Sequence, residues 1–140
     1  MLVIDTNVAS ELMRPLPTPS VVACIAERDA SAMYLTAVSE AELRFGVAIL
    51  PAGKRRTALE AAMRRWLEIG FAGRILPFDS AAACAYAEIA ADRREAGRPI
   101  GEADCQIAAI SRSRGATLVT RNVRDFEGTG VDVLDPWTTE

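Results

Sequence analysis

Short apolar segments, separated by longer stretches with helical patterns, constrain the fold of this chain more than any other feature. The five candidate strands are residues 2–4, 33–35, 75–77, 117–119 and 131–134. Each is three or four residues long and mostly apolar, as is typical of strands buried on both faces of a sheet. Strands that alternate with helices in this way indicate an α/β domain with a mostly parallel sheet, covered on both faces.

Residues that start and stop helices divide the intervening chain into six predicted helices. Pro15 and Pro17 stop a first helix over 6–13, and Asp79 with Ser80 caps a long helix that continues to Ala96. The other four are expected from Thr18–Ser20 through Glu27, from Ser39 through Ile49, from Lys54 through Arg65, and over 102–113. Since no repeat or linker interrupts this order, residues 1–140 are expected to form a single domain.

The chain contains no histidine, and this absence excludes whole classes of catalytic site. Nucleophiles activated by histidine, histidine general bases and most zinc enzymes are ruled out. Any catalysis has to use carboxylates, hydroxyls, amides, arginine or a metal ion bound by oxygen. The net charge of -3, from 16 basic and 19 acidic residues, argues against indiscriminate binding to nucleic acid. A polyanionic partner would need local basic surface or bound cations.

Cysteine usage and hydropathy indicate a reduced, soluble protein. Cys24, Cys84 and Cys105 are odd in number, widely spaced and set in apolar helical patterns, so we expect core thiols and not disulfides. No apolar run approaches the roughly 20 residues that cross a bilayer. The first residues, MLVIDTN, become polar too early for a signal peptide. The expected location is therefore the cytoplasm, without membrane contact.

Three acidic residues are candidates for a common site. Asp5 follows the first strand, so it is expected at the carboxyl edge of the sheet, although it could equally cap the next helix. On a helical projection Glu42 borders an apolar sector of Val38, Ala41, Phe45, Ala48 and Ile49, whereas Glu40 points away from it. We predict that this sector is buried and that Glu42 binds a metal. A capping box with Ser39 is the alternative role.

Asp104, Thr120 and Asn122 extend this candidate site. Asp104 shares a helical face with Ile107, Ala108 and Ser111, although an acid in the first turn can also serve helix stability alone. Thr120 and Asn122 follow a strand expected beside the first one, which brings a hydroxyl and an amide oxygen to the same edge. Oxygen ligands of this kind favour Mg²⁺ or Mn²⁺ over zinc or copper. A divalent cation would relieve carboxylate repulsion and activate water for attack on phosphorus.

These motifs together resemble the PIN domain, and within it the VapC-type toxins of bacterial toxin-antitoxin modules. The matching segments are Val3–Asn7, Ser39–Leu43 with Phe45 and Gly46, Asp104 with Ile107–Ala109, and Leu118–Asn122 with Asp125 and Phe126. Each motif alone is weak, but four in the right order within 140 residues form a specific pattern.

The resemblance implies a three-layer α/β/α sandwich and a Mg²⁺- or Mn²⁺-dependent endoribonuclease. It also implies a homodimer that is inhibited by a VapB-like antitoxin. By matching position, Asp5, Glu42 and Asp104 are the metal-binding acids and Thr120 is the hydroxyl residue of the catalytic set. Many family members carry a fourth acid where this chain has Asn122. The resemblance therefore does not establish whether the site has enough negative charge to bind a second metal ion. Asp125 is a possible substitute for the fourth acid.

RNA would need basic groups around the acidic site. Arg121, beside Thr120, and Arg14 are the candidate phosphate-binding residues. The cluster Lys54–Arg56 fits an ordinary solvated helix surface better. Two rival functions are a PIN-like interaction domain with a degenerate site, suggested by Asn122, and a HAD-like phosphatase. The phosphatase motif requires an aspartate at position 7 and a late lysine, whereas the chain has Asn7 and a single lysine, Lys54.

Overall fold

A five-stranded parallel sheet forms the centre of the protein. The computed structural model describes residues 1–138, so the last two residues of the predicted domain lie outside it. The strands are β1 (Leu2–Ile4), β2 (Met33–Thr36), β3 (Ile75–Leu76), β4 (Thr117–Val119) and β5 (Asp132–Leu134). Their spatial order is β3-β2-β1-β4-β5, and each neighbouring pair is parallel. The predicted α/β class with a parallel sheet is confirmed.

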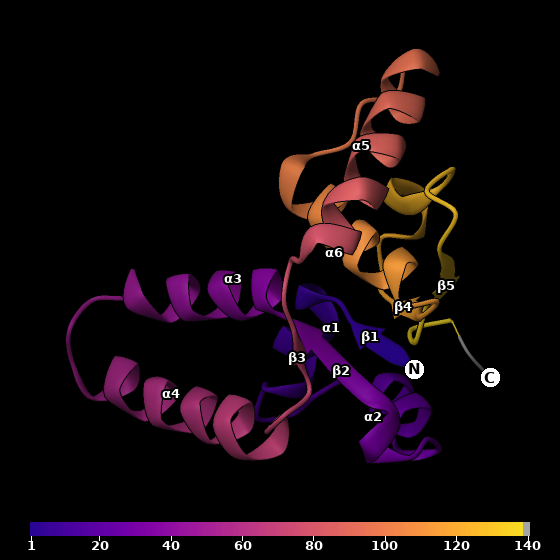
Figure 1. Cartoon of the computed structure of the whole chain (residues 1–140). Helices are drawn as coiled ribbons and strands as arrows, with labels where there is room; N and C mark the ends of the chain where they lie inside the picture. Colours follow the sequence, from indigo (N-terminus) through magenta and orange to yellow (C-terminus); the bar gives the residue numbers. More distant parts are fainter. Residues whose placement is uncertain (139–140) are drawn as a thin grey trace.

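Six α-helices within residues 1–138 cover both faces of the sheet (Figure 1). They are α1 (Thr6–Leu12), α2 (Pro19–Ala26), α3 (Ala37–Ala48), α4 (Lys54–Arg65), α5 (Ser80–Glu95) and α6 (Glu102–Ser113). Side chains alternate across a strand, so Val3 packs against α5 and α6 while Ile4 packs against α1 to α4. The result is the three-layer sandwich, with α5 and α6 forming one layer and α1 to α4 the other.

The predicted elements agree with the structure within a few residues, and three short helical turns were missed. These are two 3-10 turns, η1 (Ala30–Ala32) and η3 (Val123–Phe126), and a π-helical turn, η2 (Trp66–Gly70), that continues α4. The start of α3 was also predicted wrongly. Thr36 caps this helix by accepting a hydrogen bond from the Ser39 N–H, so α3 begins at Ala37 and Ser39 forms no capping box.

Two burial predictions were wrong. Cys24 and Cys105 are buried free thiols, but Cys84 is an exposed one. The apolar sector of α3 is also exposed, because Phe45 is 65 % and Ile49 64 % accessible. The helix has a second apolar side, and it is this side that packs, through Leu43, against the layer formed by α1 to α4. Because α3 has two apolar sides, a helical projection alone could not predict which of them is buried.

Candidate functional site

The pairing of β1 with β4 brings the first functional residues together. Ile4 is in register with Val119, so Asp5 and Thr120 leave adjacent strands at the same edge of the sheet. The Asp5 N–H donates to the Val119 carbonyl at 2.9 Å, which extends the ladder up to the site itself. The Asp5 carboxylate and the Thr120 hydroxyl therefore lie close together at the carboxyl edge of the sheet, although they are far apart in the sequence.

Asp5 is almost completely buried and its carboxylate is held on both oxygens. Oδ1 accepts from the Thr6 N–H at 2.8 Å, and Oδ2 accepts from the Thr120 hydroxyl at 2.7 Å. The Asn7 amide lies 3.4 Å from Oδ2 and also donates to Thr120 Oγ1. Burial raises the pKa of Asp5 above its usual value, with Glu42 and Asp125 adding repulsion, while the bonds from Thr120 and Thr6 oppose the rise. Asp5 therefore caps α1 and also lies in the acidic site.

Glu42 reaches the same region from α3. Its carboxylate Oε1 lies 2.7 Å from the hydroxyl of Thr6, the residue that follows Asp5. The residue is exposed, contrary to the reason for which it was selected, but its charge acts on both Asp5 and Asp104. Glu40, by contrast, pairs with Arg44 at 2.9 Å on another side of the helix. The two glutamates therefore make different contacts, but the predicted difference in burial was wrong, because Glu42 is exposed and Glu40 is half-buried.

Asp104 lies in the first turn of α6, in the opposite helical layer. Its pKa is raised to about 6, first by desolvation and then by repulsion from Asp5, Asp125 and Glu42, while Arg93 acts in the opposite direction. Mutual repulsion of this kind shows that the acids from β1, α3 and α6 share one electrostatic environment. Asp125, which the sequence offered as a possible substitute for the missing fourth acid, acts on Asp5 and Asp104 as well.

Asn122 and Asp125 lie on the segment after β4, and a buried arginine holds that segment in place. The Asn122 N–H donates to Thr120 Oγ1 at 3.1 Å, and η3 begins directly afterwards. Arg93 of α5 is 8 % exposed and donates to the carbonyls of Asp125 at 2.9 Å, Glu127 at 3.0 Å and Arg98 at 2.7 Å. Arg93 was not predicted to belong to the site, because nothing in a helical sequence pattern distinguishes a buried arginine from a solvated one.

The arrangement supplies oxygen donors suited to a hard divalent cation. Among residues 1–138, no three Asp, Glu or Cys side chains stand close enough to form a finished metal site. The four carboxylates and the Thr120 hydroxyl nevertheless offer oxygen donors at this edge of the sheet. This chemistry, together with the repulsion among the acids, fits Mg²⁺ or Mn²⁺.

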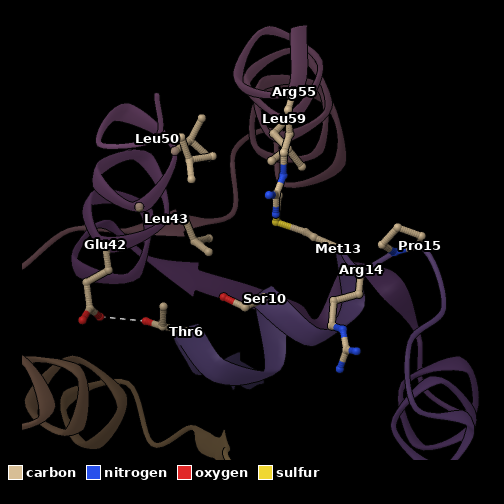
Figure 2. A pocket seen from close by; sticks show the side chains of 12 residues that line it. Thr6, Ser10, Met13, Arg14, Pro15, Glu42, Leu43, Leu50, Arg55 and Leu59 are labelled. Atoms are coloured by element: carbon tan, nitrogen blue, oxygen red, sulfur yellow. Dashed lines mark hydrogen bonds between the residues drawn. The ribbon is translucent and has the colours of Figure 1, made fainter. Parts of the chain in front are cut away.

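A groove of about 450 Å³ opens beside the acids, between α1, α3 and α4 (Figure 2). Thr6 and Glu42 form its polar end, and Figure 2 shows the contact between them. The remainder is mainly apolar and includes Met13, Leu43 and Leu59. Arg55 extends from α4 toward Met13 across this groove. An apolar groove that ends on an acidic centre can hold a partner segment and present it directly to the acids.

The two arginines predicted to meet RNA occupy different places. Arg121 follows Thr120 at the sheet edge, where its guanidinium stacks on Trp137 at 4.9 Å from the ring centroid. Its backbone N–H donates to Asn7 Oδ1 at 3.4 Å, so it adjoins the acidic centre. Arg14 lines the groove, exposed and paired with Glu11 at 3.2 Å. Arg121 therefore adjoins the acidic centre through its backbone, whereas Arg14 shares the groove with Glu42.

Comparison with known proteins identifies the family. The family model described as "PIN domain" matches residues 2–131. The chain belongs to the PIN-domain family. This PIN domain is 42 % identical over 137 residues to "VapC ribonuclease Y4jK" of Sinorhizobium fredii, covering 98 % of each chain. It is also 40 % identical over 137 residues to "Toxin FitB" of Neisseria gonorrhoeae, covering 98 % of this chain and 99 % of that one.

Solved structures agree with this assignment. The PIN domain superposes on a chain of the "Crystal Structure of FitAcB from Neisseria gonorrhoeae" with a TM-score of 0.93 at 40 % identity, covering 99 % of this chain and 100 % of the other. A chain of the "Crystal structure of DNA bound VapBC from Salmonella typhimurium" gives a TM-score of 0.78 at 28 % identity, covering 96 % and 97 %. The predicted resemblance is confirmed, and a HAD-like phosphatase is no longer a rival. Within residues 1–138 no helix is long and apolar enough to span a membrane.

The raised pKa of Asp104 predicts how the stability of this PIN domain depends on pH. Without metal, the folded state holds the Asp104 proton up to about pH 6, whereas the unfolded chain releases it near 3.8. The contribution of Asp104 to the free energy of unfolding therefore increases as the pH falls from about 6 toward 4. At pH 7.5 we expect Asp104→Asn to be more stable than the wild type by about 1–2 kcal/mol, a figure reduced for solvent screening at a half-buried group.

Urea unfolding in EDTA at pH 7.5 and pH 4 measures this effect. The gain from Asp104→Asn should disappear at pH 4, where the wild-type carboxyl is itself protonated. Asp92→Asn, on an exposed position of α5, is the matched control and should change stability little at either pH. Equal stability of Asp104→Asn and wild type at both pH values would contradict the proposed coupling among the acids.

Proposed function

We propose that this PIN domain is a Mg²⁺- or Mn²⁺-dependent endoribonuclease and the toxin of a toxin-antitoxin pair. The observation that carries the proposal is the electrostatic coupling of Asp5, Glu42 and Asp104 at the carboxyl edge of the sheet. The names of the relatives, "VapC ribonuclease" and "Toxin", support the choice of RNA as substrate and of a toxin role. The acids would bind the cation, and RNA phosphodiester bonds would be hydrolysed by water.

Each residue of the centre has a defined task in this proposal. Asp5, Glu42 and Asp104 would bind the ion, which supplies positive charge opposite the phosphate and makes the attacking water more acidic. Thr120 donates to Asp5 Oδ2 and so fixes the orientation of that carboxylate. Arg121 would bind a phosphate beside the scissile bond, with Arg14 contacting RNA further along the groove. Asn122 contributes an amide oxygen without charge, so a second ion would have to rely on Asp125 or on the phosphate itself.

Two partners besides RNA are part of the proposal. The solved relatives include the toxin-antitoxin complexes of FitAB and VapBC, which supports a VapB-like antitoxin for this chain. The groove between α1, α3 and α4 would suit such a partner, since a segment seated there would cover Glu42. The exposed apolar side of α3, with Phe45 and Ile49, supports a homodimer, because large apolar patches usually mark interaction surfaces.

Growth and RNA cleavage test the function directly. Expression of the chain alone in a bacterial host should arrest growth, and cleavage sites mapped on total cellular RNA should appear only in the arrested cells. Asp5→Asn, which keeps the side-chain shape, should abolish both effects at equal soluble expression. Normal growth with abundant soluble wild-type protein and intact RNA would contradict the proposal. Recovery of growth on co-expression of an antitoxin from the neighbouring gene would identify the partner.

The second candidate is an interaction domain without catalysis, and the amide of Asn122 favours it. A calorimetric titration with Mn²⁺ separates the two functions, because an inactive domain should show no saturable binding that Asp5→Asn and Asp104→Asn remove. Saturable binding lost in both variants supports the nuclease.

A further inference from the structure

We infer that Thr6 is a positioning residue that joins two of the acids, Asp5 and Glu42, before a cation binds. This inference rests on the proposed function and adds to it a residue that lies next to the acids but is not one of them. Thr6 is the first residue of α1, and both of its hydrogen-bond donors, the backbone N–H and the hydroxyl, contact a carboxylate. Its backbone N–H donates to Asp5 Oδ1 at 2.8 Å, and its hydroxyl oxygen lies 2.7 Å from Glu42 Oε1. One residue thus connects the edge of the sheet to α3.

The direction of the hydroxyl bonds follows from proton counting. Thr6 Oγ1 also lies 2.8 Å from the hydroxyl of Ser39, which is completely buried beneath Glu42 on the same helix. An ionised carboxylate can only accept, and a hydroxyl has a single proton to donate. The Thr6 proton must therefore go to Glu42, while Ser39 donates to Thr6. The chain Ser39 to Thr6 to Glu42 leaves the carboxylate with one defined partner.

The hydrogen bond from the Thr6 hydroxyl to Glu42 matters for ion binding because Glu42 is exposed. Several freely rotating bonds separate an exposed glutamate carboxylate from its helix, and binding an ion would have to order them. The Thr6 hydroxyl holds one oxygen of this carboxylate, Oε1, before an ion binds. A site whose ligands are ordered before binding loses less conformational entropy when the ion arrives. Because the backbone N–H of Thr6 also donates to Asp5 Oδ1, the same residue contacts both carboxylates.

Metal affinity measured without RNA tests this role. Thr6→Val keeps the shape and the backbone N–H but removes the hydroxyl, and we expect it to weaken Mn²⁺ binding by about tenfold in Kd, equivalent to about 1.4 kcal/mol. Thr6→Ser restores a hydroxyl and should remain within about twofold of the wild type. Ser39→Ala removes the donor behind Thr6 and should give an intermediate loss, about threefold. Isothermal titration calorimetry on the RNA-free protein supplies these values.

Matched controls separate positioning from folding. Thr57→Val removes a threonine hydroxyl that donates to the backbone carbonyl of Gly53, just before α4 and away from the acids, and should leave the Mn²⁺ affinity unchanged. Thermal unfolding in EDTA should show all variants folded. In cleavage assays, Thr6→Val should need more Mn²⁺ for half-maximal activity and leave KM for RNA nearly constant, because Thr6 orders the acids and does not bind RNA.

The possible results have distinct consequences. Unchanged or tighter Mn²⁺ binding by folded Thr6→Val, with a wild type that binds and cleaves, would overturn the role of Thr6 alone. Tighter binding would mean that Thr6 competes with the cation for Glu42. Failure of Thr6→Ser to recover affinity would also overturn it, since the hydroxyl would then not be the active group. A wild type that neither binds Mn²⁺ nor cleaves RNA would overturn the proposed function, and the inference with it.

Discussion

Replacing Asp5, Glu42 or Asp104 by the corresponding amide is expected to lower ribonuclease activity by about 10³-fold or more, equivalent to about 4 kcal/mol of transition-state stabilisation. Each variant removes one formal charge from a group of acids that repel one another, so the ability to hold a divalent cation falls while the metal-free fold remains stable. Cleavage of a defined RNA, followed over a range of Mn²⁺ concentrations, measures the effect. Excess Mn²⁺ should restore little activity if the lost carboxylate binds the ion directly.

Glu40→Gln is the control for Glu42→Gln, because it lies two residues away on the same helix. Glu40 is paired with Arg44, and its removal should cost no more than the fraction of a kcal/mol typical of a surface ion pair. Its activity should equal that of the wild type. If Glu40→Gln and Glu42→Gln lost activity equally at the same stability, the assignment of Glu42 to the acidic centre would be wrong.

Replacing Arg93 by leucine is expected to destabilise the protein by about 2–4 kcal/mol, the largest stability effect of any single substitution considered. The guanidinium donates to three backbone carbonyls, and its loss would leave these acceptors without their donor. Urea unfolding in EDTA gives the free-energy difference. Because one of the carbonyls belongs to η3 and another directly follows it, Mn²⁺ affinity should fall as well.

Arg93→Lys distinguishes the shape of the guanidinium from its charge. A lysine keeps the positive charge near Asp104 but cannot present the same planar set of donors. We expect it to recover less than half of the lost stability. A Leu variant within about 0.5 kcal/mol of the wild type would show that the three carbonyls find other donors, and that Arg93 does not hold the segment in place.

The helices and strands could be predicted from the sequence because the residues that begin and end them lie close to them in the chain. Each short strand is bounded by turn residues, and helix caps such as Asp79 act over three residues. The sequence also predicted that β4 lies beside β1, and their pairing confirms this. The positions of the other strands in the sheet were not predicted, because the order of parallel strands depends on packing of the entire sheet. The buried side of α3 was predicted wrongly for the same reason. Two apolar stripes are equivalent in sequence, and only the position of α1 and α4 decides which one packs.

The acidic residues were easier to predict than the residues that hold them. Asp5, Glu42 and Asp104 fall at strand ends or helix faces where a carboxylate is conspicuous, and the family motif names the same positions. Thr6 and Ser39 acquire their roles only when α1 and α3 meet, 33 residues apart in the chain. Arg93 similarly needs the segment after β4 to be in place. Such residues carry no local pattern of their own.

The acidic centre draws its members from both sides of the sheet. Glu42 belongs to α3 in one helical layer, Asp104 belongs to α6 in the other, and Asp5 ends a strand between them. A cation shared by these three would act as a cross-link through the thickness of the domain, in the way that a disulfide joins two sheets. Opening of either layer would then require release of the ion. Removal of divalent metal would then be expected to lower stability together with catalytic activity.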